Sequence, residues 1–556
     1  MQVDGSDRAG QAAEARGWRL RTVPPDLAAG YRARGAWTGT SLGQVVADGL
    51  SSMAGVGFAS RSSVRPFVGT FADVDRAART LAGNLARRGV GPGDVVVVQL
   101  PNWFEAGVAF WAAAYLGAVV VPIVHFYGPK EVGYILDTTA PAVVVTAERF
   151  GSADHLGTYP DLLADGDEVL WLVVGDSPAS ALPDRATRFG DLLDGDPLVE
   201  PAVVDPAGPA VIGFTSGTTR NPKGVIHTHD TLAFEARQLD HMFPVGGPPQ
   251  ITGAPVGHFI GMLNAFIVPL LRHRPVNLVD VWDPTEVLRL MEEEGLGVTG
   301  GATYFLTSLL DHPDFTDAHL AMMPFAGLGG SPVPDAVTER ATRLGIAVFR
   351  SYGSTEHPSV TGCLLDDPEE KRLRTDGHAL PEVEVRLDDD GEILSRGPDL
   401  FAGYTDPSLT ATVFDPDGWY RTGDIGRLDD EGYLTITDRI ADVIIRGGEN
   451  ISAREVEELV AEVDGIAEVS VVAAPDDRFG ERAAAVVRVR DGGPAPGLDA
   501  VCAHLLDAGL ARQKWPESLH VVDELPRTPS GKVKKFVLRE QLQRGELAAA
   551  DARERG

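Results

Sequence analysis

The chain has 556 residues, of which 44% are hydrophobic and 23% charged, a composition typical of a globular protein with a large buried core and several structural units. Its formal net charge of −31 at pH 7 argues against nucleic acid and anionic membranes as partners, because the chain repels both at long range. Two cysteines are too few for a disulfide framework or a cysteine-rich zinc site, and they indicate a reducing compartment, the cytoplasm. The start, MQVDGSDRAGQAAEARG, has no apolar stretch and is not typical of a signal peptide.

Strand-like and helical segments alternate from about residue 70 to residue 440, which predicts layered α/β structure. The segment FADVDRAARTLAGNLARRG is a predicted helix. The predicted strands are the apolar runs DVVVVQL, AVVVPI, AVVVTA, VLWLVV, AVIGF, VNLVD and AVFRSYG.

One uncharged stretch, residues 106–124, covers nineteen positions and is close to the length of a membrane span. Its first half is rich in alanine, Gly117 follows, and the apolar run AVVVPI comes next. This order favours a buried helix that turns into a buried strand over a membrane span.

Between residues 383 and 438 apolar and polar residues alternate around acidic turns, which predicts antiparallel hairpins. The turn sequences DDDG, DPDG and DDEG also suggest calcium loops. None of them has the full ligand spacing of a calcium loop with its terminal glutamate, so we favour plain turns.

A smaller unit is expected after Arg439, where Ser452 and Glu455 form a predicted capping box ahead of a helix. Two strands, EVSVVAA and AAAVVRVR, and a further helix are predicted to follow. We therefore expect a large N-terminal domain over residues 1–438 and a small C-terminal domain over residues 439–556.

The stretch TSGTTRNPKG, residues 215–224, directly follows the predicted strand AVIGF. Its hydroxyls, glycines, Arg220 and Lys223 offer hydrogen-bond donors and positive charge, which suit a polyphosphate. The spacing of a P-loop is absent, and a flexible surface loop is the alternative. A binding role for Lys223 is favoured because lysine is scarce in this acidic chain. The lysines are Lys130, Lys223, Lys371, Lys514, Lys532, Lys534 and Lys535.

Three more segments carry related chemistry. SYGSTE (351–356) offers an aromatic ring to stack on a base, hydroxyls to reach a phosphate and a carboxylate to hold Mg²⁺. WYRTGD (419–424) ends in an acid suited to the two hydroxyls of a ribose, and PRTPSGKVKK (526–535) places Lys532 at a loop tip. Each segment alone is compatible with an ordinary turn, but their occurrence together in this order is not expected by chance.

These segments resemble the core motifs of the adenylate-forming superfamily, which contains acyl-CoA synthetases, adenylation domains of peptide synthetases and beetle luciferases. GEILSRGPDLFAGYTDPSLT and DRIADVIIRGGENISAREVEE are also similar, so the resemblance covers roughly residues 40–540. Among subfamilies the chain most resembles medium-chain and cyclohexanecarboxylate-type CoA ligases. The resemblance implies an α/β fold: a large N-terminal domain of layered subdomains with a small β-barrel-like part, followed by a small, mobile α+β domain that carries a catalytic lysine.

The resemblance also implies the residues that bind ATP. They would grip the β- and γ-phosphates, line the adenine pocket and hold the ribose hydroxyls. In that order, they are Thr215, Ser216, Gly217, Thr218, Thr219 and Lys223, then Gly329, Gly330, Ser331, Tyr352 and Gly353, then Asp424 and Arg439.

Three further residues are implied in catalysis. Thr355 would contact the α-phosphate, Glu356 would ligate Mg²⁺, and Lys532 would bridge the substrate carboxylate and the α-phosphate. Positive charge from Mg²⁺ and Lys532 would offset the negative charge that gathers at the phosphorus in the transition state.

In this superfamily the small domain swings between two half-reactions. The expected hinge is Ala441, and Gly447 with Gly448 would face the pantetheine arm of CoA, where a side chain would narrow the tunnel. Two positions depart from the pattern. Arg220 replaces a frequent glycine and either adds charge near the triphosphate or points to solvent. Ala441 replaces the usual Asp or Lys, which bears on the balance between the two states.

The segment APVGHFIGM (254–262) corresponds to the acyl pocket, and it lacks the Asp with which amino-acid-activating relatives hold an α-ammonium group. His258 is a predicted gate between this pocket and the CoA tunnel, and a hydrogen-bonded structural histidine is the alternative. GGATYFL (300–306) and residues 357–362 are expected to line the rest. Their small residues leave room for an aliphatic, alicyclic or aryl group.

The predicted function is activation of a carboxylic acid by ATP as an acyl-adenylate, followed by transfer to CoA, with Mg²⁺ required. Alternatives keep the adenylation step but change the acid or the acceptor: an amide synthetase, a carrier-protein ligase or a nitrite-activating diazotase. A non-catalytic nucleotide-binding homologue is disfavoured because the charge-handling residues are present. We expect no nucleic-acid partner and no membrane span, and a homodimer is compatible with this prediction.

Overall fold

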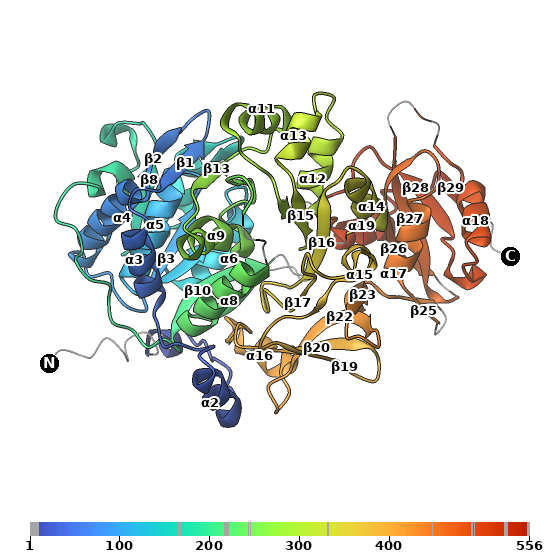
Figure 1. Ribbon diagram of the computed structural model, residues 1–556, viewed down its shortest axis with the longest axis horizontal. Helices are drawn as coiled ribbons and strands as arrows, with labels where there is room; N and C mark the ends of the chain where they lie inside the picture. Colours follow the sequence, from blue (N-terminus) through green and yellow to red (C-terminus); the bar gives the residue numbers. More distant parts are fainter. Residues whose placement is uncertain are drawn as a thin grey trace. The chain divides into compact units, whose positions relative to one another are not determined.

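The computed structural model describes residues 11–163, 168–215, 222–242, 244, 246–330, 333–446, 449–476, 478–490, 493, 495–527 and 532–552. The chain forms two compact units. The first comprises the residues up to 373 together with 377–384 and 395–420, and the second comprises 374–376, 385–394 and the residues from 421 onward. Figure 1 shows the elements in chain order, coloured from blue at the N-terminus to red at the C-terminus.

The largest sheet of the first unit has eight strands within the described residues. In sheet order they are β21 (Gly403–Tyr404), β11 (Lys223–Thr228), β10 (Pro209–Thr215), β4 (Val119–Pro122), β3 (Val95–Gln99), β5 (Val143–Ala147), β8 (Leu170–Val174) and β9 (Ala186–Arg188). Strands β4, β3, β5 and β8 pair in parallel, and nearly all of their residues are buried. Burial on both faces explains why these strands are unbroken apolar runs in the sequence. The prediction of these strands is confirmed.

Helices α4 (Phe71–Ala86) and α5 (Phe104–Tyr115) pack against each other, and α5 also packs on β3 and β4. A capping box starts α4, in which the Asp73 carboxylate accepts a hydrogen bond from the backbone N–H of Thr70 (2.9 Å). Helix α5 is buried from Glu105 onward, and Gly117, with a φ of +65°, then turns the chain into β4. The uncharged stretch is therefore a buried helix followed by a buried strand, as predicted. Within the described part of the chain, no helix has the length and apolar character needed to cross a bilayer.

Two further sheets belong to the first unit. One contains β12 (Ile251–Thr252), β13 (Val276–Val279), β1 (Gly57–Arg61) and β2 (Phe67–Thr70) in that order. The other contains β14 (Gly300–Gly301), β15 (Phe325–Leu328), β16 (Ala347–Tyr352), β17 (Thr361–Gly362) and β18 (His378–Ala379). Strands β15 and β16 are parallel, with Leu328 opposite Arg350. The residues that directly follow the two strands, Gly329 and Gly353, and the last residues of β16, Ser351 and Tyr352, therefore lie toward the same edge of this sheet.

The second unit is built largely on two sheets. The first contains β19 (Glu384–Leu387), β20 (Glu392–Arg396), β22 (Tyr420–Leu428) and β23 (Leu434–Arg439). The other contains β25 (Glu449–Ile451), β24 (Ile444–Arg446), β27 (Gly480–Val489), β28 (Ser518–Val521) and β29 (Asp551–Ala552), with β26 (Ile466–Asp476) paired to β27. Its helices include α17 (Ala453–Val460), α18 (Leu498–Asp507) and α19 (Lys535–Gln543). The predicted N-cap of α17 is confirmed, since Ser452 Oγ accepts a hydrogen bond from the N–H of Glu455 (3.1 Å).

The acidic turns are plain turns, as predicted. Asp388 Oδ1 accepts hydrogen bonds from the N–H groups two and four residues later (3.0 and 2.9 Å). Asp415 and Asp429 repeat this pattern in their own turns. Each of these carboxylates thus satisfies backbone donors of its own turn, which explains why Asp occupies the first position.

The predicted boundary after residue 438 falls inside the second compact unit, because strands β22 and β23 cluster with the C-terminal part. Two hydrogen bonds span this point within the unit. Ser452 Oγ donates to the carbonyl of Thr437 (3.2 Å), and Arg454 Nη1 donates to the carbonyl of Ile436 (2.6 Å). Where the chain turns during the reaction therefore stays a prediction.

Candidate active site

The hairpin of β10 and β11 carries the two ends of the predicted phosphate loop. Thr215 and Lys223 face each other in its antiparallel register, so the loop starts and ends at the same edge of the sheet. Both residues are half-buried. Outside the described residues lie the loop positions Ser216, Gly217, Thr218, Thr219 and Arg220.

Thr355 and Glu356 occupy the two central positions of a tight turn after β16. The N–H of Ser354 donates to the carbonyl of His357 (2.9 Å), and the N–H of His357 donates to Ser354 Oγ (3.2 Å). The side chains of both central residues are half-buried. The turn thus presents a hydroxyl and a carboxylate on adjacent residues, as required to bind a phosphate and a metal ion.

Neighbouring elements hold the backbone of this turn. His227 Nε2, on β11, lies 2.7 Å from the carbonyl oxygen of Thr355, and the N–H of Phe401 donates to the carbonyl of Glu356 (2.9 Å). Burial lowers the pKa of His227 to about 4, so the ring is neutral at pH 7 and its Nε2 carries the donated proton. Gly213, on β10, leaves room for the Thr355 side chain, because a Cβ at position 213 would lie only 2.9 Å from Thr355 Cγ2.

Lys223 and Glu356 both interact with Tyr404. The Nζ of Lys223 lies 5.6 Å from the centroid of the Tyr404 ring, and the Tyr404 hydroxyl donates to Glu356 Oε1 (2.9 Å). Burial, reinforced by the Glu356 carboxylate, raises the pKa of Tyr404 well above its ordinary value, so the hydroxyl keeps the proton that it donates. A cation and the carboxylate predicted to bind a metal ion thus lie against the same ring.

The predicted adenine site lies at the ends of β15 and β16. Tyr352 is 8% exposed. A Cβ at Gly353 would lie 1.8 Å from a backbone carbonyl oxygen, one at Gly329 would lie 2.8 Å from another, and Gly330 has a φ of +73°. Backbone packing and conformation therefore suffice to explain these glycines, and their role in binding adenine stays a prediction. Ser331 lies outside the described residues.

His258 is the N-cap residue of helix α9 (Phe259–Phe266), although its side chain makes no capping hydrogen bond. Its ring is half-buried, and its centroid lies 6.4 Å from that of Phe126. The preceding Gly257 is explained by packing, since a Cβ there would lie 2.4 Å from the carbonyl oxygen of Ile123. The gate assignment of His258 stays a prediction.

Two residues expected to line the acyl pocket have a different structural role. Gly300 pairs with Gly327 of β15, and a Cβ at Gly300 would lie 2.3 Å from the carbonyl oxygen of Gly327. The sheet alone therefore requires its small size, and its place in the acyl pocket stays a prediction. His357 is fully buried, with Nδ1 2.8 Å from Ser395 Oγ, so its ring lies in the protein interior.

The predicted ribose residues come together in the second unit. Asp424 on β22 faces Arg439 on β23, and Arg439 Nε donates to Asp424 Oδ1 (2.6 Å). The Asp424 side chain is 5% exposed and that of Arg439 is 54% exposed. The guanidinium therefore orients a nearly buried carboxylate. An oriented, charged carboxylate is suited to accept hydrogen bonds from two hydroxyl groups.

Lys532 is exposed and belongs to the second unit. Arg527 and Val533 form an antiparallel bridge at the base of its loop. The N–H of Lys534 also donates to a carbonyl of the opposite segment (2.7 Å). The loop therefore has a fixed base next to the lysine. Gly447 and Gly448 lie outside the described residues.

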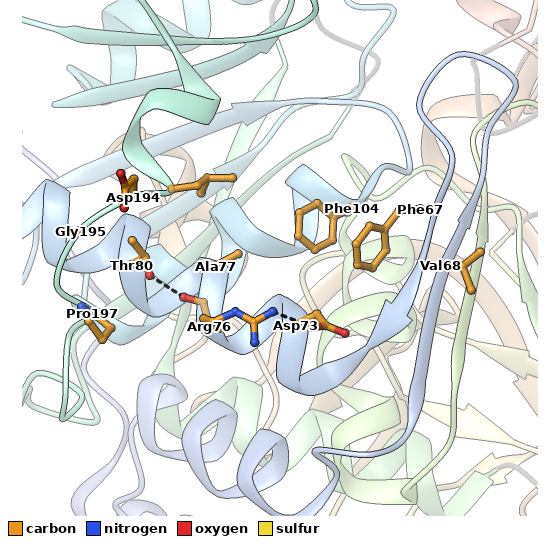
Figure 2. A pocket seen from close by; sticks show the side chains of 11 residues that line it. Phe67, Val68, Asp73, Arg76, Ala77, Thr80, Phe104, Asp194, Gly195 and Pro197 are labelled. Atoms are coloured by element: carbon orange, nitrogen blue, oxygen red, sulfur yellow. Dashed lines mark hydrogen bonds and ion pairs between the residues drawn. The ribbon is translucent and has the colours of Figure 1, made fainter.

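A cavity of about 690 Å³ in the first unit is lined by none of the described candidate residues. Figure 2 shows its wall, where Phe67 and Phe104 stack with ring centroids 4.0 Å apart. Arg76 also lines the cavity and pairs with Asp73 (2.7 Å). Because these two charged groups already pair with each other, we assign the cavity no part in the reaction.

The family model of the AMP-binding enzyme matches residues 65–405, and the model of the AMP-binding enzyme C-terminal domain matches residues 455–532. The chain belongs to the AMP-binding enzyme family. This AMP-binding enzyme is 34% identical to the medium-chain fatty-acid–CoA ligase of Escherichia coli (strain K12), over 85% of this chain and 86% of the relative.

Further relatives agree with this assignment. A methyl-dioxo-octahydroindenyl-propanoyl:CoA ligase of Rhodococcus jostii (strain RHA1) is 37% identical, over 85% of this chain and 93% of the relative. The crystal structure of ATP-bound MatB from Rhodopseudomonas palustris has a TM-score of 0.79 at 28% identity, covering 90% of this chain and 98% of that chain. The predicted superfamily, the likeness to medium-chain CoA ligases and the α/β fold with a large N-terminal and a small C-terminal domain are confirmed.

Two residues that hold the site of this AMP-binding enzyme were not singled out from the sequence: His227 and Tyr404. Tyr404 lies in a stretch included in the resemblance, but no role was assigned to it. Its contact with Glu356 joins residues 48 positions apart, and that of His227 with Thr355 joins residues 128 positions apart. The only available signal was that polar residues stand at the ends of apolar strands near the motifs.

Proposed function

We propose that this AMP-binding enzyme is an ATP-dependent acyl-CoA ligase, which activates a carboxylic acid as an acyl-adenylate and transfers the acyl group to CoA. The observation that carries the proposal is the meeting of Lys223 and Glu356 at Tyr404, which brings a cation for phosphate and a carboxylate for a metal ion into one region. The two relatives from Escherichia coli and Rhodococcus jostii are CoA ligases by name, which supports this class of reaction.

The proposed acid has an aliphatic, alicyclic or aryl chain and no α-amino group. The segment 254–262 contains no acidic residue that could hold an α-ammonium group. The names of the two relatives, a medium-chain fatty-acid ligase and a ligase for a bicyclic propanoyl group, support an apolar acyl chain.

Mg²⁺ fits the residues of the turn. Tyr404 fixes one oxygen of the Glu356 carboxylate, and the Thr355 hydroxyl stands on the adjacent residue. Mg²⁺ is usually bound by one or two carboxylates together with substrate phosphates and water. A single acid suits that mode, and the described residues contain no cluster of three or more His, Cys, Asp or Glu placed for a metal ion. Bound there, Mg²⁺ would supply positive charge to the phosphates.

In the first half-reaction the substrate carboxylate attacks the α-phosphorus, and pyrophosphate leaves. We propose that Lys223 holds the outer phosphates, Tyr352 lies against adenine and Asp424 holds the ribose. Lys532 then offsets the negative charge that gathers at the α-phosphate during the attack. In the second half-reaction the CoA thiolate attacks the acyl carbonyl, and AMP leaves as a good leaving group.

A panel of carboxylic acids, assayed for pyrophosphate release with and without CoA, tests the proposal. We expect acid-dependent release, and acyl-CoA with AMP as products by mass spectrometry when CoA is present. If no acid supports exchange of pyrophosphate into ATP, the adenylation step is wrong. If the adenylate forms but CoA yields no thioester, the acceptor is different, and an amine, a carrier protein or nitrite as reactant becomes the better assignment.

A further inference from the structure

A buried polar network lies behind the turn that carries Thr355 and Glu356. It joins Glu235 on helix α8 (His229–Met242), Asp399 in the segment after β20, and His357 at the end of the turn. The side chains of all three residues are 0% exposed, and all belong to the first unit. None of them takes part in the proposed reaction, so their burial needs another explanation.

Hydrogen bonds link the network to the turn. His357 Nε2 lies 3.3 Å from Asp399 Oδ1, and its Nδ1 lies 2.8 Å from Ser395 Oγ. Ser359, two residues further on, donates from Oγ to Glu235 Oε1 (2.8 Å). The segment that follows Glu356 is therefore fastened to both carboxyl groups.

The remaining oxygens of the two carboxyl groups need a hydrogen-bond donor. Glu235 Oε2 and Asp399 Oδ2 are buried, and neither receives an N–H or O–H donor from the described residues. A side-chain hydrogen bond with Asp399 is among the causes that raise the pKa of Glu235. Two buried carboxylates in contact are strongly disfavoured as anions, whereas one proton between them satisfies both oxygens. Burial, followed by the Asp399 charge, raises the pKa of Glu235 well above its ordinary value of 4.5, which places the proton on Glu235.

We propose that Glu235, Asp399 and His357 are positioning residues of the ligase: protonated Glu235 donates to Asp399, Asp399 accepts from His357, and this chain of hydrogen bonds holds the turn that presents Thr355 and Glu356 to metal-bound ATP. What the turn binds rests on the proposed function, whereas the hydrogen-bonded chain does not. Gly397 supports the close fit, because a Cβ there would lie 2.8 Å from His357 Nε2 and 3.0 Å from Asp399 Oδ1.

Other titratable and charged groups surround the pair. His227 on β11, Tyr31 on helix α2 (Pro25–Ala33) and the His357 ring all lie within electrostatic reach of Asp399. Two cations are also in the vicinity: Arg396, which lies within electrostatic reach of Tyr31, and Arg21, a buried guanidinium that donates to the carbonyls of Phe401 and Leu400 (2.9 and 3.3 Å). Burial lowers the pKa of Arg21 only to about 10, so it remains charged at pH 7.

Two substitutions of Glu235 test the proposal. Glu235→Gln keeps the shape and still offers an N–H donor to Asp399, whereas Glu235→Leu removes the donor. The readouts are the Kd for Mg²⁺·ATP by calorimetry and hydrogen exchange of the amides of residues 354–357. We expect Glu235→Gln to stay within about threefold of the wild type in both, and Glu235→Leu to weaken binding and lose exchange protection by about tenfold or more, the cost of one orphaned buried acceptor.

The control is Thr338→Val, which removes a buried hydroxyl elsewhere in the first unit, one that donates to the carbonyl of Asp335 (2.8 Å). It should lower stability and leave both readouts unchanged. If Glu235→Gln and Glu235→Leu weaken ATP binding and exchange protection equally, Glu235 is not a protonated donor. If hydrogen exchange is unchanged in Glu235→Leu, the network does not position the turn. A wild-type chain that does not bind Mg²⁺·ATP would overturn the proposed function, while the exchange comparison would still decide the network.

The pH dependence of stability gives a second test that needs only Glu235→Gln. In the folded chain Glu235 keeps a proton that it releases on unfolding above pH 4.5, so this group favours unfolding increasingly as pH rises, until its own folded pKa is reached. The ratio of the unfolding constants of the wild type and Glu235→Gln, measured by urea unfolding, should therefore rise with pH above about pH 5, by up to about tenfold per pH unit. A ratio that does not change with pH would show that Glu235 is ionised in the fold and would overturn the proposal.

Discussion

Three side chains of this enzyme carry the charges that the proposed chemistry needs: Lys223, Glu356 and Lys532. The first two meet at Tyr404 and are half-buried, so their positions are set before substrate arrives. Lys532 is exposed, and the described contacts hold the base of its loop at Arg527 and Val533. A charge fixed in advance needs no reorganisation during the reaction, whereas an exposed lysine acts only when its loop is brought to the substrate. Lys532 should therefore matter in one half-reaction alone.

We predict that Lys532→Ala slows adenylation by about two to three powers of ten, because it removes the charge that faces the α-phosphate in the transition state. Formation of the thioester from supplied acyl-adenylate should be unaffected. Pyrophosphate exchange and thioester formation are measured separately, with Lys534→Ala as the control. Equal loss in both half-reactions would contradict the assigned role.

Helix α19 connects the lysine loop to the predicted hinge of the second unit. It begins three residues after Lys532, at Lys535, whose Nζ pairs with Glu457 of α17 (2.9 Å). One turn later Arg539 pairs with Asp442 (2.5 Å), the residue after the predicted hinge. The side chains of Arg539 and Asp442 are 22% and 19% exposed, so this ion pair is screened less by solvent than a surface pair. The helix is thus tied both to α17 and to the hinge segment.

A double-mutant cycle of Arg539→Ala and Asp442→Ala should give a coupling free energy of about 1–3 kcal/mol in the unfolding of the chain, since the two groups lose a partly buried partner. The reference is the pair of Arg544, the C-cap residue of the same helix, with Glu540; their side chains are 64% and 56% exposed. We expect about 0.5 kcal/mol or less there, as for exposed helix pairs. Similar couplings in the two cycles, from urea unfolding, would show that the contact with the hinge segment contributes nothing specific.

The molecule as a whole has to accommodate both proposed half-reactions, the first with Lys532 at the α-phosphate and the second with CoA at the acyl carbonyl. The predicted hinge, Ala441, lies in the short helix Ile440–Asp442, directly after β23. If the chain turns there, the hydrogen bonds of Ser452 and Arg454 to the backbone of β23 must break, because they span the hinge. These bonds therefore stabilise one of the two arrangements.

Ala441→Pro should separate the two half-reactions. Proline fixes φ near −65°, so the dihedral change of a hinge is no longer available, and we expect one half-reaction to persist while the other falls by about tenfold or more. Ala441→Gly, which frees the same dihedral, should retain both. The rates of pyrophosphate exchange and of thioester formation are the measurements. If proline leaves both rates unchanged or lowers both equally, the hinge is elsewhere.

Much of the fold could be predicted from the sequence, because some structural constraints are local. Strands β3, β4, β5 and β8 are buried on both faces and are therefore unbroken apolar runs. The hairpin turns carry Asp at the position that satisfies backbone donors two and four residues later. Gly300 shows the limit of such reasoning: a glycine is equally expected beside a substrate and beside a neighbouring strand, and only the distance of 2.3 Å from a potential Cβ to Gly327 distinguishes the two.

The sequence by itself determined which chemical groups are available: a loop rich in hydroxyls with Lys223, a turn with Thr355 and Glu356, an acid at Asp424 and a lysine at Lys532. The tertiary structure alone decided how they are held. The partners of the turn are Tyr404, His227 and the network of Glu235, Asp399 and His357, and several of these contacts join residues 42 to 128 positions apart. Motifs and hydrophobic periodicity reflect the needs of neighbouring residues in the chain, whereas a shared proton or a fixed carboxylate depends on which distant side chains are buried together.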